Sequence, residues 1–144
     1  MQCLDDVYKK IDEKNIELFT RRMKSCDAAT IEVNKAYGII IDQTQLKDRN
    51  DEFMALAHEY GHCESGTTHK LDSEFQLIGQ HENRANRAAV YEFLPVEKIK
   101  DAFKHKYFDY WEIADYLDLP EAFVKMAIDI YTVEGKLKEY RYVE

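Results

Sequence analysis

The sequence predicts an α+β fold in which a small, largely antiparallel sheet packs on a helical core. The first third of the chain is rich in β-forming residues, later segments carry apolar residues at helical spacing, and the connections between the expected strands are short. The 144 residues, 45% of them hydrophobic, are enough for one domain with one core. We therefore predict a single domain over residues 1–144, with the sheet and two long helices in residues 1–95, a helical segment in 96–135 and a tail in 136–144.

The expected strands follow a short N-terminal helix. Residues 4–14 have apolar side chains at helical spacing and predict that helix. Residues 16–21 and 28–42 are richer in β-formers, and the chain can turn near Asn34. Residues 37–41 have the pattern of a strand that is buried on both faces or nearly so, which gives a sheet of about three strands.

Residues that begin and end helices mark the rest of the chain. Asp48, Asn50 or Asp51 can cap the start of a helix. Gly66 is expected to end this helix, because glycine is common just after the last turn of a helix. Pro95 and Pro120 are each expected at the first position of a later helix, which proline suits. Residues 67–76 are expected to form an irregular polar connection, followed by a helix at residues 78–94. Three further helices are expected: one that starts at Pro95, one at residues 110–117 that begins with an Asp109–Glu112 capping box, and one that starts at Pro120. The tail after Gly135 is expected to be a short strand or disordered.

An HExxH motif, residues 58–62, lies on the helix that Gly66 is expected to end. His58 and His62 are four residues apart and share one helical face, so both imidazoles can reach one Zn²⁺ at ~2.0–2.1 Å. Glu59 lies about 100° round the helix, where it can accept a proton from the water that the metal activates. We predict two metal ligands and a catalytic base. The alternative is a pair of surface histidines, although the motif arises by chance in well under about one in a hundred chains of this length.

A catalytic zinc site usually has three protein ligands and one open position, so a third ligand is needed from another element. Glu82 is the candidate, because Glu82, Ala85 and Ala89 share one face of the next expected helix. These small residues, with Gly61 on the HExxH helix, allow the two helices to approach closely. Asn86 lies one turn after Glu82 and is expected to orient its carboxylate. Taken alone, Glu82 would be interpreted as a solvated surface residue.

These segments resemble the ImmA/IrrE family of metallo-endopeptidases, particularly the short forms carried by prophages and mobile elements of Gram-positive bacteria. Many members have an aromatic residue where this chain has Ala88, a difference that affects packing rather than ligation. The resemblance implies that Glu82 is the third zinc ligand. The matching residues are Leu56–His62, the preceding strand Gly38–Asp42, the run Glu82-x-x-Ala85-Asn86-x-x-Ala89 ending at Phe93-Leu94-Pro95, and the C-terminal segment Trp111–Leu117.

By the same resemblance, the expected activity is zinc-dependent cleavage of a helix-turn-helix repressor that keeps a mobile element silent. An extended substrate could be aligned by an exposed strand, with the strand ending near Asp42 as the candidate. The alternative is a non-enzymatic anti-repressor that binds the repressor and has a structural or vestigial zinc site. The intact Glu59 counts against it, because a structural site has no use for a general base. A toxin–antitoxin component is a weaker alternative.

Charge and composition exclude other classes. The formal net charge of −8 disfavours broad nucleic-acid binding. Residues 109–135 resemble a helix-turn-helix motif in their predicted helices. They contain seven acidic residues and one basic residue, Lys125, which favours packing or protein docking over DNA recognition. No apolar run approaches the ~20 residues of a membrane span and no signal peptide is evident, so a cytoplasmic protein is expected. The three cysteines, without CxxC spacing, argue against a disulfide framework.

Several other residues have more than one interpretation. His81 is either a surface residue or a hydrogen-bond donor to the transition state. His69, in the polar connection, is interpreted as a bystander. His105 lies in a basic patch at a helix end, where cations suit the helix dipole. Cys63 is expected to be a buried thiol rather than a ligand. The sequence does not distinguish between four candidate oxyanion stabilisers: Tyr60, Tyr91, Tyr107 and Tyr110.

Overall fold

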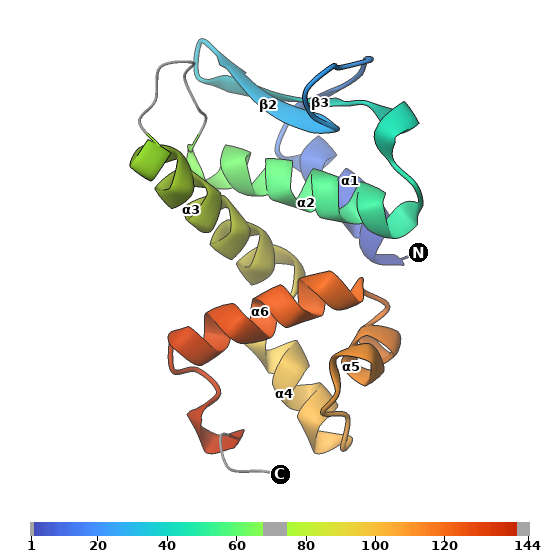
Figure 1. Ribbon diagram of the computed structural model, residues 1–144, viewed down its shortest axis with the longest axis vertical. Coiled ribbons are helices and arrows are strands. Elements are labelled where there is room, and N and C mark those ends of the chain that lie inside the picture. Colours follow the sequence, from blue (N-terminus) through green and yellow to red (C-terminus); the bar gives the residue numbers. More distant parts are fainter. Residues whose placement is uncertain (1, 68–74, 141–144) are drawn as a thin grey trace. The chain divides into compact units, whose positions relative to one another are not determined.

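Six helices and a three-stranded sheet make up the part of the chain that the structure, a computed structural model, describes: residues 2–67 and 75–140 (Figure 1). The predicted α+β class is confirmed. The chain divides into two compact units, residues 1–89 and 90–144, while the expected single domain stays a prediction. The first unit contains α1 (Gln2–Glu13), β1 (Glu17–Thr20), β2 (Ala28–Val33), β3 (Ala36–Ile41), the 3₁₀ helix η1 (Gln43–Gln45), α2 (Arg49–Ser65) and most of α3 (Phe75–Phe93).

The sheet has the order β1-β3-β2 and is mixed, not antiparallel throughout. β2 and β3 form the expected hairpin, turning at Asn34 and Lys35, whose φ angles of 52° and 66° suit a tight primed turn. β1 runs parallel to β3. The reason is that residues 21–27 carry the chain across to the far edge before β2 begins, so β3 enters between the two earlier strands.

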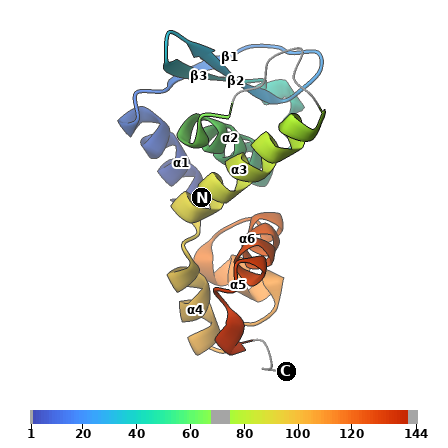
Figure 2. The ribbon, with the colours of Figure 1, turned by 90° about the vertical axis from the view of Figure 1, so that its left-hand side faces the viewer.

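Helix α2 lies against the inner face of the sheet, and α1 packs on α2 (Figure 2). Asp48 caps α2 by accepting the Asp51 amide at 2.9 Å, and Gly66 ends it with φ 67°, as predicted. Between the layers, Ile39 and Ile41 are fully buried. Each such side chain contributes roughly 1.5–3 kcal/mol through burial.

Helix α3 begins at Phe75, so the last residues of the expected irregular connection are helical. Residues 68–74 of the expected connection, His69 among them, lie outside the described residues. Gly61 of α2 faces the backbone of α3: a Cβ at Gly61 would lie 2.0 Å from the carbonyl oxygen of Ala85. The close approach that small residues were expected to allow is therefore present.

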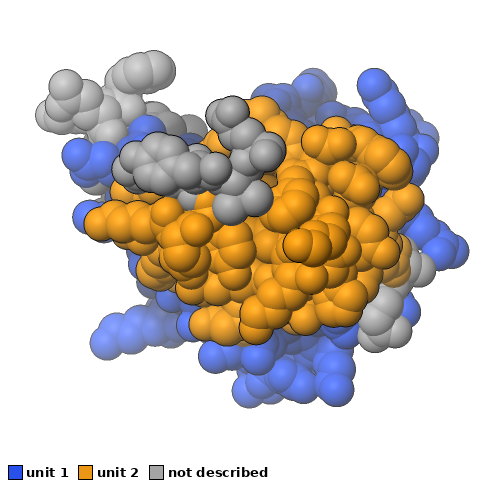
Figure 3. All heavy atoms as spheres, turned by 90° about the horizontal axis from the view of Figure 1, so that it is seen from below, with its two compact units in different colours: residues 1–89 blue, residues 90–144 orange. Residues whose placement is uncertain are grey.

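The second unit, orange in Figure 3, continues from the last residues of α3 through three helices. Pro95 and Pro120 occupy the N-cap positions, one residue earlier than expected. The Asp109 amide donates to Glu112 Oε1 at 3.3 Å, which is the Glu half of the predicted capping box. The tail is neither a strand nor disordered at residues 138–140. The elements of this unit are α4 (Val96–Lys104), α5 (Tyr110–Leu117), α6 (Glu121–Val133) and the 3₁₀ helix η2 (Lys138–Tyr140).

Among the described helices, none combines the length and the apolar character that crossing a membrane requires.

Candidate metal centre

The three predicted ligands come together between α2 and α3. His58 Nε2 and His62 Nε2 are 3.2 Å apart. Glu82 reaches both histidines, with Oε2 at 2.5 Å from His58 Nε2 and Oε1 at 3.0 Å from His62 Nε2. Their ligand atoms all lie within 4.8 Å of one another, and no other group of this kind occurs in residues 2–67 and 75–140.

The second nitrogen of each imidazole is engaged away from this centre. His62 Nδ1 lies 2.7 Å from the carbonyl oxygen of Thr67, which can only accept a hydrogen bond. Neutral His62 therefore carries its proton on Nδ1 and presents a lone pair on Nε2. His58 Nδ1 lies 2.8 Å from Asn86 Oδ1, which assigns the same tautomer to His58. Asn86 does hydrogen-bond to a predicted ligand, but its partner is His58 rather than the expected Glu82 carboxylate.

Local structure explains why Thr67 lies beside His62. Gly66 adopts a left-handed conformation, which turns the chain back over the last turn of α2. The Thr67 amide then donates to the carbonyl of His62 at 3.1 Å, and Thr67 is almost fully buried. The glycine four residues after the second histidine therefore supplies a hydrogen-bond partner to that histidine.

The side chains present suit a metal ion. With both imidazoles neutral and protonated on Nδ1, the centre holds two imidazole lone pairs and a carboxylate, and a metal cation between them would be bound by all three. Two nitrogens bound to a tetrahedral zinc ion lie ~3.4 Å apart, close to the 3.2 Å between the two Nε2 atoms. Imidazole and carboxylate ligands are also those of catalytic zinc sites that keep one position open.

Glu59 lies beside this centre and is buried, with 8% of its surface exposed. Thr30, on β2, donates to Glu59 Oε1 at 2.8 Å, and its Oγ1 also lies 3.1 Å from the backbone oxygen of Glu59. Burial raises the pKa of the Glu59 carboxyl, and the hydrogen bond from Thr30 works against that rise. The predicted base therefore has a defined position next to the ligands without being one of them.

The ligands and Glu59 open into a pocket of about 420 Å³. Its opposite wall is β2, which contributes the small side chains Ala28, Ala29 and Thr30, with Cys26 just before the strand. β2 pairs with β3 along one edge, and no described strand pairs along the other. The strand ending near Asp42, which was expected to align a substrate, is β3. Because β3 is the central strand of the sheet, that expectation is wrong, and β2 is the edge strand beside the centre.

Other predicted residues lie elsewhere. Cys63 is a buried thiol, as expected, and burial raises its pKa to about 12. His81 is half-buried and is not among the described residues lining the pocket. Tyr60 is fully buried, with its hydroxyl 3.4 Å from Glu64 Oε2, so it does not line the pocket either. The other candidate tyrosines, Tyr91, Tyr107 and Tyr110, and the exposed His105 belong to the second unit.

Sequence reasoning missed Thr30 and Thr67. Thr30 is 29 residues from Glu59 and reaches it only because β2 packs on α2. For Thr67, the helix-ending Gly66 was the available signal.

Comparison of the chain with protein-family models, with curated proteins and with solved structures gives no match. The activity is therefore inferred from the chemistry of the centre.

Proposed function

We propose that this chain is a zinc-dependent endopeptidase domain in which His58, His62 and Glu82 hold the metal. The observation that carries the proposal is the convergence of these three ligands from two helices beside a buried glutamate, at the floor of an open pocket. A purely structural zinc site is closed by four protein ligands and needs no adjacent base.

The residues of the chain divide the chemistry between them. A zinc ion held here would supply a Lewis acid that polarises the scissile carbonyl and lowers the pKa of a water to ~7. Glu59 would act as the general base that accepts a proton from the attacking water and as the acid that passes it to the leaving amine. Thr30 holds Glu59 Oε1, which leaves Oε2 to carry the proton. Asn86 and Thr67 hold the two imidazoles with their Nε2 atoms toward the metal.

The substrate is proposed to bind as an extended strand along the uncovered edge of β2. An added strand gains backbone hydrogen bonds from an edge, and its alternate side chains enter the pocket. The residues of β2 at this point, Ala28, Ala29 and Thr30, are small and leave room beside Glu59. Thr30 thus links the proposed substrate strand to the base.

The resemblance to the ImmA/IrrE family, carried by Leu56–His62 and Glu82–Pro95, makes a helix-turn-helix repressor of a prophage or mobile element the proposed protein substrate. The acidic charge of the chain agrees with a protein substrate and not with direct nucleic-acid binding. The rival function is an anti-repressor that binds the same repressor without cutting it.

The test uses a candidate helix-turn-helix repressor, chosen from genes neighbouring the one for this chain, incubated with zinc-loaded protein and analysed by intact mass. Wild type should produce two repressor fragments, and Glu59→Gln should produce none while keeping its zinc. Equal cleavage by both proteins would remove Glu59 as the base. Relief of repression by Glu59→Gln without any fragments would favour the anti-repressor.

A further inference from the structure

The hydrogen bonds between β2 and β3 determine which residues of β2 face its free edge. The Asp42 amide donates to the carbonyl of Asp27 at 2.8 Å, so Asp27 directs its backbone toward β3. In an antiparallel ladder, residues that face the partner strand alternate with residues that face away from it. Ala29 therefore also turns its N–H and C=O toward β3, whereas Ala28 and Thr30 turn theirs toward the free edge beside the metal pocket.

The side chains of the same two residues face the metal pocket. Thr30 donates to Glu59 Oε1 at 2.8 Å, and Ala28, with 8% of its surface exposed, lines the pocket. Cys26 continues this row two residues earlier, in agreement with the alternation of side chains along a strand. Residues directly opposite one another on paired strands point to the same face of a sheet. A segment bound at this edge therefore directs the side chains opposite Ala28 and Thr30 into the pocket.

The wall of the pocket around Ala28 is made of small, uncharged side chains. Cys26, Ala28 and Ala29 line this part, and no described lysine or arginine lines the pocket. The polar end of the wall is Thr30, whose hydroxyl is already engaged with Glu59. An aliphatic side chain gains free energy by leaving water against such a wall, whereas a polar side chain of the same size loses its water without a new partner. The space beside Ala28 therefore suits an aliphatic side chain.

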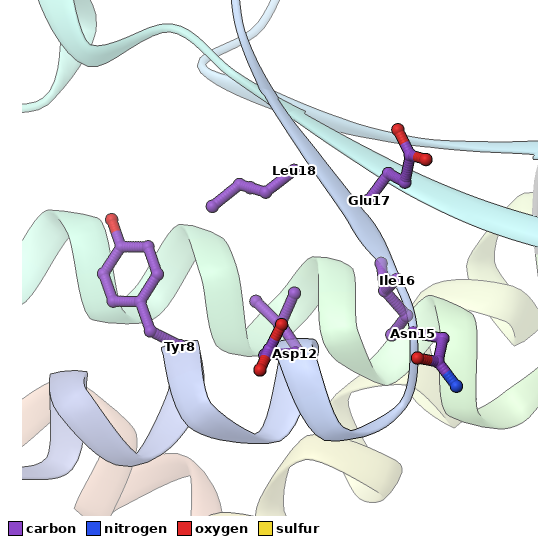
Figure 4. A pocket seen from close by; sticks show the side chains of 7 residues that line it. Tyr8, Asp12, Asn15, Ile16, Glu17 and Leu18 are labelled. Atoms are coloured by element: carbon purple, nitrogen blue, oxygen red, sulfur yellow. The ribbon is translucent and has the colours of Figure 1, made fainter.

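The opposite edge of the sheet, formed by β1, provides a comparison. It borders a separate pocket of about 540 Å³ between α1 and β1. Figure 4 shows Tyr8 and Asp12 on the α1 side of this pocket and Leu18 on the β1 side. Among the described residues, this pocket shares no lining residue with the metal pocket. Of the two edges, β2 is therefore the one that brings a bound segment to the metal centre.

We propose that Ala28 is a specificity-determining residue: its outward N–H and C=O pair with one residue of an extended substrate, and the space beside its methyl group takes an aliphatic side chain from that residue. This inference rests on the proposed function, because the metal centre makes this edge a substrate site. Thr30 pairs with the substrate two residues further along, which brings the backbone between them close to Glu59. The substrate segment has no helix or strand pairing of its own at this point, because such pairing would occupy its backbone groups.

The test is fluorescence anisotropy with zinc-loaded Glu59→Gln protein, so that binding is measured without cleavage. The probes are blocked, labelled seven-residue threonine peptides with leucine, asparagine or alanine at the central position. The leucine peptide should bind roughly tenfold more tightly than the other two. Adding Ala28→Val fills the space and should remove most of the preference for leucine over alanine. Leu18→Thr, on β1, is the matched control and should leave all three affinities unchanged.

The backbone pairing is tested with the leucine peptide N-methylated at alternate residues, in either of the two possible phases. Only alternate amides of a bound strand point toward β2, so one phase should abolish binding and the other should have little effect. If Ala28→Val does not fold, Ala28→Gly enlarges the same space. That variant should then raise the affinity for a phenylalanine peptide relative to the leucine peptide.

Equal affinities for the leucine and asparagine peptides, an unchanged preference in the Ala28 variants, or equal losses from both methylation patterns would overturn the proposal. So would loss of binding in Leu18→Thr without an effect at Ala28, because the peptide would then lie on β1. The expected binding pattern in a protein that cleaves no repressor would support the role of Ala28 and count against the peptidase activity alone.

Discussion

The carbonyl oxygen of Ala85 lies only 2.0 Å from the point where a Cβ on Gly61 would stand. Gly61 is between the two motif histidines and Ala85 is three residues after Glu82, so this contact sets how close α3 comes to α2 where the three proposed ligands meet. The backbone cannot move aside as the end of a flexible side chain can.

Gly61→Ala should therefore separate the two helices. We expect a loss of roughly 1–3 kcal/mol in the free energy of unfolding, measured with urea in the presence of a chelator. Zinc affinity should fall in parallel, because Glu82 is displaced from the histidines. Gly79→Ala is the matched control on α3, since a Cβ there meets nothing within 4 Å; it should gain ~0.5–1 kcal/mol. Unchanged zinc affinity in Gly61→Ala would refute the proposed role of this contact.

Thr30→Val keeps the shape of the side chain and removes the hydrogen bond to Glu59. If Thr30 positions the base, kcat for repressor cleavage should fall roughly tenfold, the size expected for a hydrogen bond to a charged group. KM and zinc content should stay close to wild type. Thr30→Ser restores the hydroxyl and should recover most of the rate. A valine variant with wild-type kcat would show that Glu59 needs no such support.

Asn86→Ala should weaken zinc binding without removing a ligand. Loss of the partner of His58 Nδ1 frees the imidazole to rotate and change tautomer, which typically costs 10–100-fold in metal affinity. Competition with a chromogenic chelator measures this. Asn83→Ala, an exposed position on the same helix, is the control and should bind zinc as wild type does. Equal affinities for the two variants would contradict the assignment.

Asp42 predicts a pH dependence of stability. Its carboxylate accepts bonds from Met23 N, Thr44 N, Thr44 Oγ1 and Gln45 Nε2, and these bonds hold the pKa of Asp42 far below its usual range. A lowered pKa stabilises the folded state above the unfolded-state value of ~3.9, and the contribution is lost as pH falls below it.

Asp42→Asn should accordingly be less stable than wild type by a constant amount from about pH 8 to pH 5, and the difference should shrink below about pH 4. Urea unfolding at a series of pH values, with a chelator present, measures it. Asp48→Asn is the control. Because asparagine remains a good helix cap, the stability of this variant should stay close to that of wild type. A difference between Asp42→Asn and wild type that stays the same down to pH 3 would contradict the assignment.

The parts of the molecule that depend on local sequence were predictable. The HExxH helix follows from i, i+4 spacing, Asp48 and Gly66, and Glu82 follows from the face it shares with Ala85 and Ala89. The features that depend on long-range packing were not. Asn86 bonds to His58 because the crossing of α2 and α3, which no single helix specifies, selects that partner.

The sheet shows the same division. The hairpin of β2 and β3 could be predicted from the turn near Asn34, because a two-residue turn makes the strands on either side of it antiparallel. The parallel pairing of β1 was not visible, since the seven residues 21–27 can lead to either edge of the sheet. That choice makes β3 central and places Thr30 of β2, instead of the strand end near Asp42, beside Glu59.

The metal content of purified protein shows whether the chain holds zinc and whether Glu82 is one of its ligands. After equilibration with zinc and removal of excess by gel filtration, elemental analysis should give close to one zinc per chain for wild type and for Glu59→Gln. Glu82→Ala should retain well under half of that, because two histidines alone hold the ion weakly. One zinc per chain in Glu82→Ala would contradict the assignment of Glu82 as a ligand, and no zinc in wild type would contradict the metal centre itself.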